Sequence, residues 1–172
     1  MNLIIVDDDK NIRQTLSWLL TDEDHEVELC QNGQEAIAVT NERTFDLMFM
    51  DLMMPGMTGL EALKPVLANL PFLKVIMISG QADLSTAVRA TKLGAYDFLE
   101  KPLNPEKVLL EVKKIREQDA AKNKINELKK LVDADYQMIG DSPQMQQLKE
   151  FINQAAPSEG RILIYGENGT GK

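Results

Sequence analysis

Cysteine, aromatic residues and long apolar runs are all scarce in this sequence of 172 residues. Cys30 is the only cysteine, which excludes an internal disulfide, and we expect it to be a small buried strand residue. No stretch approaches the roughly 18 consecutive apolar residues of a membrane-spanning helix. The chain also opens without a charged and then apolar leader, because Met1–Val6 leads directly into three aspartates. These absences predict a cytoplasmic protein with no membrane partner.

Positive charge is in short supply as well. The sequence has 19 Lys and Arg against 27 Asp and Glu, a formal net charge of −8 at pH 7. No basic surplus is available to neutralise phosphates, which argues against this chain binding nucleic acid by itself. The 44% of apolar and 27% of charged residues are typical of an ordinary globular protein. The length allows one full core, with a remainder too short for a second ordinary domain.

Short apolar runs alternate five times with longer amphipathic stretches in residues 1–117. The runs predict strands at 3–6, 27–30, 47–50, 75–78 and 98–99, and the stretches between them predict helices. Right-handed crossovers then force a parallel sheet with helices on both faces. Near-continuous apolar strands agree, because parallel strands are covered on both sides. The prediction is an α/β domain of the flavodoxin-like, doubly wound kind.

Polar side chains follow four of these apolar runs at or just after their ends. Asp7 and Asp8 follow the first run, Asp51 the third, Ser79 the fourth and Lys101 the fifth. In a doubly wound sheet the carboxyl ends of the strands lie at one rim, where such sheets bind ligands. Three carboxylates gathered there would repel each other without a cation. Hard oxygen ligands of this kind suit Mg²⁺, which retains waters and bridges to phosphate.

The same set of side chains suits phosphoryl transfer. An Asp carboxylate can act as a nucleophile and form an acyl phosphate. A nearby hydroxyl and ammonium would stabilise the equatorial oxygens of the transferring group. Any one Asp alone would more simply be a helix cap or a turn residue. Because four strand ends carry such side chains together, we favour a shared site.

Four motifs carry a resemblance to a known family. They are Val-Asp-Asp-Asp at 6–9, Met-Asp-Leu-Met-Met-Pro-Gly-Met-Thr-Gly at 50–59, Ile-Ser-Gly at 78–80 and Lys-Pro at 101–102. In order and spacing they resemble the bacterial receiver domains of response regulators, over residues 1–117. The resemblance implies a five-stranded parallel sheet of order 2-1-3-4-5.

The resemblance also implies roles for individual residues. Asp51 is then the phosphoacceptor, and Asp7 and Asp8 form the acidic pocket. Mg²⁺ is expected in that pocket, with Asp8, Asp51 and the main-chain carbonyl of Met53 around it. The other matches are Ser79 as the switch hydroxyl, Lys101 as the phosphate-contacting lysine and Phe98 as the aromatic switch residue.

The helical pattern that begins at Pro105 continues past the expected domain edge. Apolar residues resume at Ile125, Leu128, Leu131 and Val132, which predicts a linker helix over 118–137, either one long helix or part of a pair. An apolar stripe on a projecting helix needs a partner, so we expect a homodimer. A solvated linker with a docked end is the alternative. A dimer face on the fourth helix and fifth strand is equally open.

Residues 138–172 resemble the opening of the AAA+ ATPase domain of sigma-54-dependent enhancer-binding regulators of the nitrogen-regulation type. Ser142 should cap a short helix, and a strand run follows at 161–165. The next seven residues match the phosphate-binding loop G-x-x-x-x-G-K. Because the chain ends there, we expect an N-terminal fragment of that domain. The nucleotide-binding residues of this incomplete loop would be Gly166, Gly169, Gly171 and Lys172.

In that family a sensor histidine kinase phosphorylates the receiver, after which an ATPase ring acts on sigma-54 RNA polymerase and a further domain binds DNA. The resemblance therefore implies a phosphoacceptor signalling domain and not an enzyme, with ATP relevant only to the full-length parent protein. An aspartate-nucleophile phosphatase is disfavoured, because Met53 stands where a second acid is usual. A receiver-like module that is never phosphorylated is the remaining alternative. The lone histidine, His25, is expected to be solvated in its Asp-rich turn.

Overall fold

The computed structural model describes residues 1–80, 84–135, 140–157, 163 and 165. It divides into two compact units, Met1–Ala120 and Ala121–Lys172. The proposed bounds of the receiver (1–117), linker (118–137) and ATPase fragment (138–172) stay a prediction. The predicted strand at 161–165 falls largely outside the described residues, and Gly166, Gly169, Gly171 and Lys172 fall wholly outside them.

The first unit is built on one parallel sheet. Its strand order is β2-β1-β3-β4-β5, which confirms the predicted doubly wound topology. The register pairs Val6 with Met50, Asp51 with Ile78 and Ser79 with Glu100, so the carboxyl ends lie at one rim. The strands are β1 (Asn2–Val6), β2 (Glu26–Cys30), β3 (Leu47–Asp51), β4 (Lys74–Ser79) and β5 (Asp97–Glu100).

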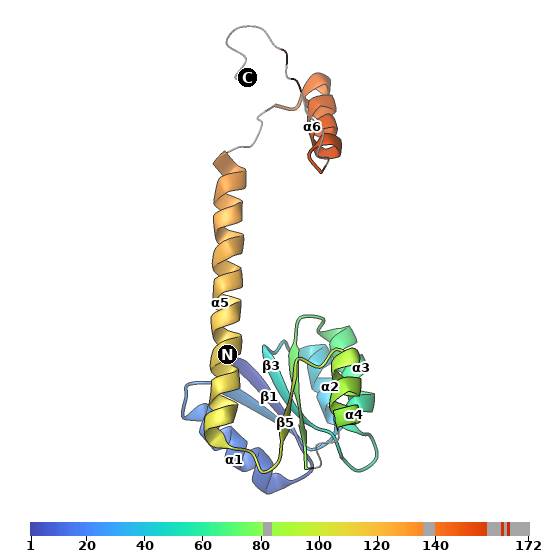
Figure 1. Ribbon diagram of the computed structural model, residues 1–172, viewed down its shortest axis with the longest axis vertical. Helices are drawn as coiled ribbons and strands as arrows, with labels where there is room; N and C mark the ends of the chain where they lie inside the picture. Colours follow the sequence, from blue (N-terminus) through green and yellow to red (C-terminus); the bar gives the residue numbers. More distant parts are fainter. Residues whose placement is uncertain (81–83, 136–139, 158–162, 164, 166–172) are drawn as a thin grey trace. The chain divides into compact units, whose positions relative to one another are not determined.

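Helices cover both faces of the sheet (Figure 1). Those of the first unit are α1 (Lys10–Thr21), α2 (Gly33–Glu42), α3 (Gly59–Asn69), α4 (Leu84–Lys92) and the start of α5 (Pro105–Asp135). On one face, Leu3 and Ile5 of β1 pack in the cluster that includes α1 and α5 residues. On the other, Ile4 and Val6 pack in the cluster that includes α3 and α4 residues. Each strand therefore contributes to two cores, as expected for a sheet buried on both sides.

Side-chain caps start the helices that leave the rim. Asp9 accepts a hydrogen bond from the Asn11 backbone N–H at 2.8 Å and so begins α1. Thr58 and Glu61 form a reciprocal capping box at the start of α3. Each cap satisfies backbone donors that would otherwise be unpaired at a helix N-terminus. The loop after β1, which carries Asp7 and Asp8, and the loop after β3, which directly follows Asp51, are thereby held at both ends.

Of the predictions made for two buried residues, one is confirmed and the other is wrong. Cys30 is 1% exposed, as expected, and burial raises the pKa of its thiol to about 12. His25 was expected to be solvated, and this is wrong, because it is only 8% exposed. Burial lowers the pKa of His25, and Leu109, Val112 and Arg116 of α5 lie around the same hollow. The polar turn did not reveal that a helix distant in sequence packs over it.

The linker forms one continuous helix rather than a pair, because α5 spans 31 residues. Its first part docks through Val108, Val112 and Ile115, all at most 2% exposed. Two polar contacts extend this docking, between Lys74 and Asp119 and between Tyr96 and Gln118, and both lie within the first unit.

Beyond Ala120, the apolar side chains of α5 are not buried. Ile125 and Leu128 are each 53% exposed. They are available to a partner but equally compatible with a solvated linker. In the second unit, Ser142 caps α6 (Pro143–Ala155) by accepting from the Met145 N–H, as predicted. Within the part of the chain that the structure describes, no helix combines the length and apolarity needed to span a bilayer.

Candidate functional site

The residues predicted to form the site meet at the carboxyl rim of the sheet. Asp51 is the last residue of β3 and is 4% exposed. Asp7 directly follows β1 and is fully buried, and Ser79 ends β4 at 1% exposure. Lys101 directly follows β5. Parallel pairing of β1, β3, β4 and β5 therefore brings together four segments that are far apart in the sequence.

Three carboxylates form the acidic part of the site. Asp7, Asp8 and Asp51 each offer one oxygen, and these three atoms lie within 4.8 Å of one another. Asp8 is exposed, whereas the side chains of Asp7 and Asp51 are 0% and 6% exposed. A set made only of carboxylate oxygens fits Mg²⁺, a hard cation that prefers oxygen ligands and keeps part of its water shell.

Lys101 neutralises part of this charge. Its Nζ donates to Asp7 Oδ2 at 2.8 Å and lies 3.2 Å from Asp51 Oδ1. Burial opposes the charged ammonium, but the hydrogen bond and the negative charge of Asp7, together with Asp51, outweigh it and raise the pKa of Lys101. The lysine is therefore held as a cation between the two buried carboxylates.

Asp51 is less stable as an anion than an ordinary carboxylate. Burial raises the pKa of Asp51, and the neighbouring charges of Asp7 and Asp8 raise it further. Lys101 acts in the opposite direction by its charge and its hydrogen bond but does not reverse the shift. A like-charged, desolvated carboxylate of this kind is stabilised by any cation that approaches it. The site thus favours binding of a divalent metal.

Ser79 and Phe98, the residues predicted to act as a switch, lie in the neighbouring strands β4 and β5. The main-chain oxygen of Ser79 accepts from the Lys101 backbone N–H at 2.7 Å, so the hydroxyl and lysine positions are directly linked. Phe98 is paired with Met77 in the sheet and lies half-buried against the α3 and α4 core. The Met53 side chain is 69% exposed. The functional roles of Ser79, Phe98 and the Met53 carbonyl stay predictions.

Two neighbours of the site were not identified from the sequence. Arg13 of α1 donates to the main-chain oxygen of Asp7. Gly59, at the start of α3, packs directly on the main-chain oxygen of Asp51, and its N–H donates to the Leu52 oxygen at 3.0 Å. For Arg13, the available sequence signal was an arginine one turn into the helix that follows the acidic loop. The Gly59 contact depends on the path of the whole loop and has no comparable local signal.

The comparisons with known proteins agree with this geometry. Residues 3–113 match the family model described as the response regulator receiver domain. The chain belongs to the response regulator receiver family. Residues 138–172 match a second model, the sigma-54 interaction domain. This confirms the resemblance inferred from the motifs, both for the receiver and for the fragment that follows it.

Two curated relatives match over essentially the whole length of this chain. The nitrogen assimilation regulatory protein NtrX of Azorhizobium caulinodans is 34% identical over 99% of this chain and 38% of its own length. The transcriptional regulatory protein ZraR of Klebsiella oxytoca is 35% identical over 100% of this chain and 38% of its own length. The chain thus spans less than two fifths of the relatives it matches.

Solved structures confirm the receiver fold. The chemotaxis protein CheY4 of Vibrio cholerae is similar with a TM-score of 0.63 and 33% identity, covering 66% of this chain and 97% of that protein. NtrX of Brucella abortus is similar with a TM-score of 0.70 and 34% identity, covering 94% of this chain and 36% of that protein. The second similarity extends past the receiver into the linker helix and the partial AAA+ segment.

Proposed function

We propose that this receiver accepts a phosphoryl group on Asp51 from the phosphohistidine of a sensor kinase. The observation that carries the proposal is the arrangement at the rim, where Lys101 contacts Asp51 and two further carboxylates, those of Asp7 and Asp8, lie beside it. An Asp51 carboxylate oxygen attacks phosphorus, a P–O bond forms, and the P–N bond to the kinase histidine breaks. The leaving imidazole nitrogen keeps the electron pair.

The other site residues act on the oxygens of the transferring group. The Lys101 ammonium already lies 3.2 Å from Asp51 and can follow one phosphoryl oxygen. The Ser79 hydroxyl, at the end of the neighbouring strand β4, would contact another. Mg²⁺, held by Asp8, Asp51 and the Met53 main-chain carbonyl with Asp7 beside it, would add positive charge to the phosphoryl oxygens when bound. No residue is required as a general base, because the carboxylate form of Asp51 attacks directly and has no proton to lose.

The test is intact-mass measurement after incubation with Mg²⁺ and acetyl phosphate. We expect one added phosphoryl group on the wild-type chain and none on Asp51→Asn. Asp22→Asn, which changes an exposed carboxylate at the end of α1, is the matched control and should be modified like the wild type. Modification of Asp51→Asn, or none of the wild type with either acetyl phosphate or a sensor kinase, would contradict the proposal and favour a module that is never phosphorylated.

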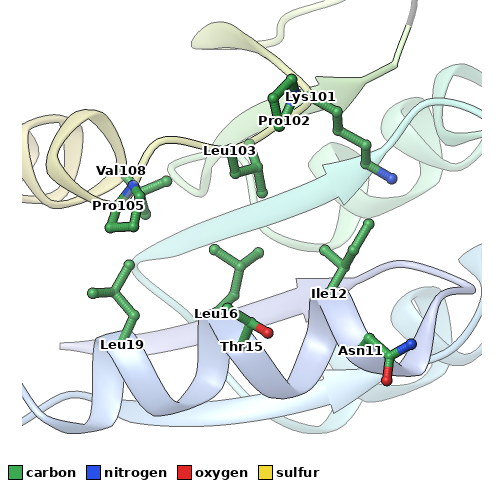
Figure 2. Close-up of a pocket in the computed structure, with 10 residues that line it drawn as sticks. All are labelled: Asn11, Ile12, Thr15, Leu16, Leu19, Lys101, Pro102, Leu103, Pro105 and Val108. Atoms are coloured by element: carbon green, nitrogen blue, oxygen red, sulfur yellow. The ribbon is translucent and has the colours of Figure 1, made fainter.

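A pocket beside the acidic site offers a docking place for the kinase. It has a volume of about 300 Å³ and lies between α1 and the segment that joins β5 to α5 (Figure 2). Its walls include Ile12, Leu16 and Leu103, and Lys101 contributes to one end. A donor that brings phosphohistidine to Asp51 must pass close to this apolar surface. A helix of the kinase laid beside α1 would bury it, which is a common mode of recognition.

A charge placed at this pocket should affect phosphorylation by the kinase but not phosphorylation by acetyl phosphate. Thr15 is exposed and lines the pocket, and Thr15→Arg should slow phosphorylation by the sensor kinase about tenfold or more, roughly the loss of one good contact. Modification by acetyl phosphate should be unchanged, because Asp51 is not touched. The assay is the initial rate with the kinase that phosphorylates the wild type fastest. Trp18→Arg, on the same helix but outside the pocket lining, is the control; an equal loss there would count against this docking place.

The remaining inferences concern the parent protein. The match of residues 138–172 to the sigma-54 interaction domain supports a parent that hydrolyses ATP and acts on sigma-54 RNA polymerase and DNA through segments beyond these residues. Exposed Ile125 and Leu128 support a homodimer joined along α5. Phosphorylation of the receiver by a sensor kinase that uses ATP supports a cytoplasmic location.

A further inference from the structure

The loop between β1 and α1 is held by an arginine that the phosphoryl chemistry does not use. Arg13 lies in the first turns of α1, is partly buried, and its Nη1 donates to the main-chain oxygen of Asp7. This is the only hydrogen bond of its guanidinium within the described ranges of the chain. The acceptor is not a carboxylate, although three acidic side chains lie close by. Arg13 therefore binds the backbone of the acidic loop rather than pairing with its charges.

The contacts of Asp7 and Asp8 are strongly unequal. Asp7 is tied by its N–H to the Cys30 oxygen, by Oδ1 to the Asp9 N–H, by Oδ2 to Lys101 and by its carbonyl to Arg13. For the Asp8 side chain, in contrast, the described parts of the structure contain no hydrogen bond. Asp8 is also the exposed member of the three. Its carboxylate is consequently oriented only by the backbone on which it stands.

We propose that Arg13 is a positioning residue for magnesium binding, acting through the Asp7–Asp8 peptide. The peptide group is planar, so holding the Asp7 carbonyl also fixes the plane that contains the Asp8 nitrogen and Cα. That plane fixes the Asp8 Cα, and together with the backbone φ angle of Asp8 it sets the direction in which the side chain leaves the loop. The inference rests on the proposed function, because it concerns the cation that the phosphoacceptor site binds. Groups that orient metal ligands without touching the metal commonly affect affinity by 10- to 100-fold.

Electrostatics alone predicts the opposite result, which makes the proposal testable. A guanidinium cation next to the acidic loop repels Mg²⁺, so removing its charge should strengthen binding. Loss of the hydrogen bond to the Asp7 carbonyl should instead weaken binding. Lys10 supplies a matched comparison, since it is an exposed cation that lines the same small hollow as Arg13. No hydrogen bond or ion pair of Lys10 occurs among the described residues.

The experiment is a calorimetric titration of the unphosphorylated chain with MgCl₂. We expect Arg13→Met to raise the dissociation constant about tenfold, and Arg13→Lys, which keeps one donor, to recover part of the loss. Lys10→Met should leave the constant unchanged or lower it. A second readout is the acetyl phosphate reaction, in which Arg13→Met should need about tenfold more Mg²⁺ for half-maximal rate while the rate at saturating Mg²⁺ stays near wild type.

Each outcome bears on one proposal only. An unchanged or lower dissociation constant in folded Arg13→Met would overturn the positioning role. If Arg13→Met does not fold, Arg13→Gln carries the same expectation, because its side chain is too short to reach the Asp7 carbonyl. If the wild type itself binds no Mg²⁺ and takes no phosphoryl group, the proposed function fails instead. If the wild type binds Mg²⁺ and the Arg13 variants bind it with the same dissociation constant, only the inference about Arg13 is removed.

Discussion

Gly59→Ala should lower the stability of the receiver by about 3 kcal/mol, because the space at this position is already filled. A Cβ on Gly59 would lie 2.2 Å from the main-chain oxygen of Asp51 and 2.9 Å from the terminal methyl of Met77. The methionine can change rotamer, but the strand-end carbonyl cannot move without shifting Asp51 itself. Thermal unfolding followed by circular dichroism should show a melting temperature lower by roughly 10 °C.

The matched comparison is Gly80→Ala, at the residue that directly follows the neighbouring strand β4. A Cβ on Gly80 would meet no atom within 4 Å, so its stability should stay within about 0.5 kcal/mol of the wild type. Equal losses in the two variants would show that glycine is required for backbone freedom rather than for space. The Gly59 variant should also be phosphorylated more slowly in its folded fraction, since the carbonyl that must move belongs to Asp51, the proposed phosphoacceptor.

Lys101→Met should be the most destabilising change among the charged residues of the site. The substitution leaves Asp7 and Asp51, whose side chains are 0% and 6% exposed, without their ammonium partner. Removing one member of a buried ion pair commonly costs about 3–5 kcal/mol, and we expect about 2–3 kcal/mol because Lys101 is itself 20% exposed. Urea unfolding at pH 7.5 without divalent ions measures this loss.

The pH dependence of that loss follows from the carboxylates. Burial and the charge of Asp7 already hold the pKa of Asp51 above its ordinary value, and loss of Lys101 raises it further. A carboxyl whose pKa is higher in the folded state than in the unfolded state destabilises the fold as the pH rises above its unfolded value. The defect of Lys101→Met should therefore be largest at neutral pH and shrink toward pH 4.

Two additions should restore stability to this variant. Millimolar Mg²⁺ returns positive charge to the pocket, and the second substitution Asp51→Asn removes one of the repelling carboxylates. Both should recover a large part of the unfolding free energy at pH 7.5. A loss that is independent of pH, of Mg²⁺ and of Asp51→Asn would mean that Lys101 stabilises the receiver by packing and not by its charge.

Much of the fold could be predicted because its signals are local. An apolar run predicts a buried strand, and the Asp, Ser or Lys that ends it is read at the same place in the sequence. The five alternations then leave few topologies, since parallel crossovers have one hand. Asp7, Asp51, Ser79 and Lys101 were identified in this way, before any distance between them was known.

The contacts that give the site its properties were decided only by tertiary structure. Lys101 and Asp7 are 94 positions apart, and their 2.8 Å contact depends on the order of β1, β3, β4 and β5 and on strand register. The hydrogen bond from Arg13 to the Asp7 carbonyl and the packing of Gly59 on Asp51 depend on loop paths that no periodicity encodes.

The difference between local and tertiary information explains both the wrong prediction for His25 and the predictions that were confirmed. His25 was misjudged because its turn is polar, whereas its burial comes from α5, which lies far along the chain. Sequence by itself determined the period of each element and, to within one residue, where each strand stops, since these depend on neighbours in the chain. Tertiary structure decided burial, charge pairing and free space at the rim, because these depend on which distant segments the sheet brings within contact distance.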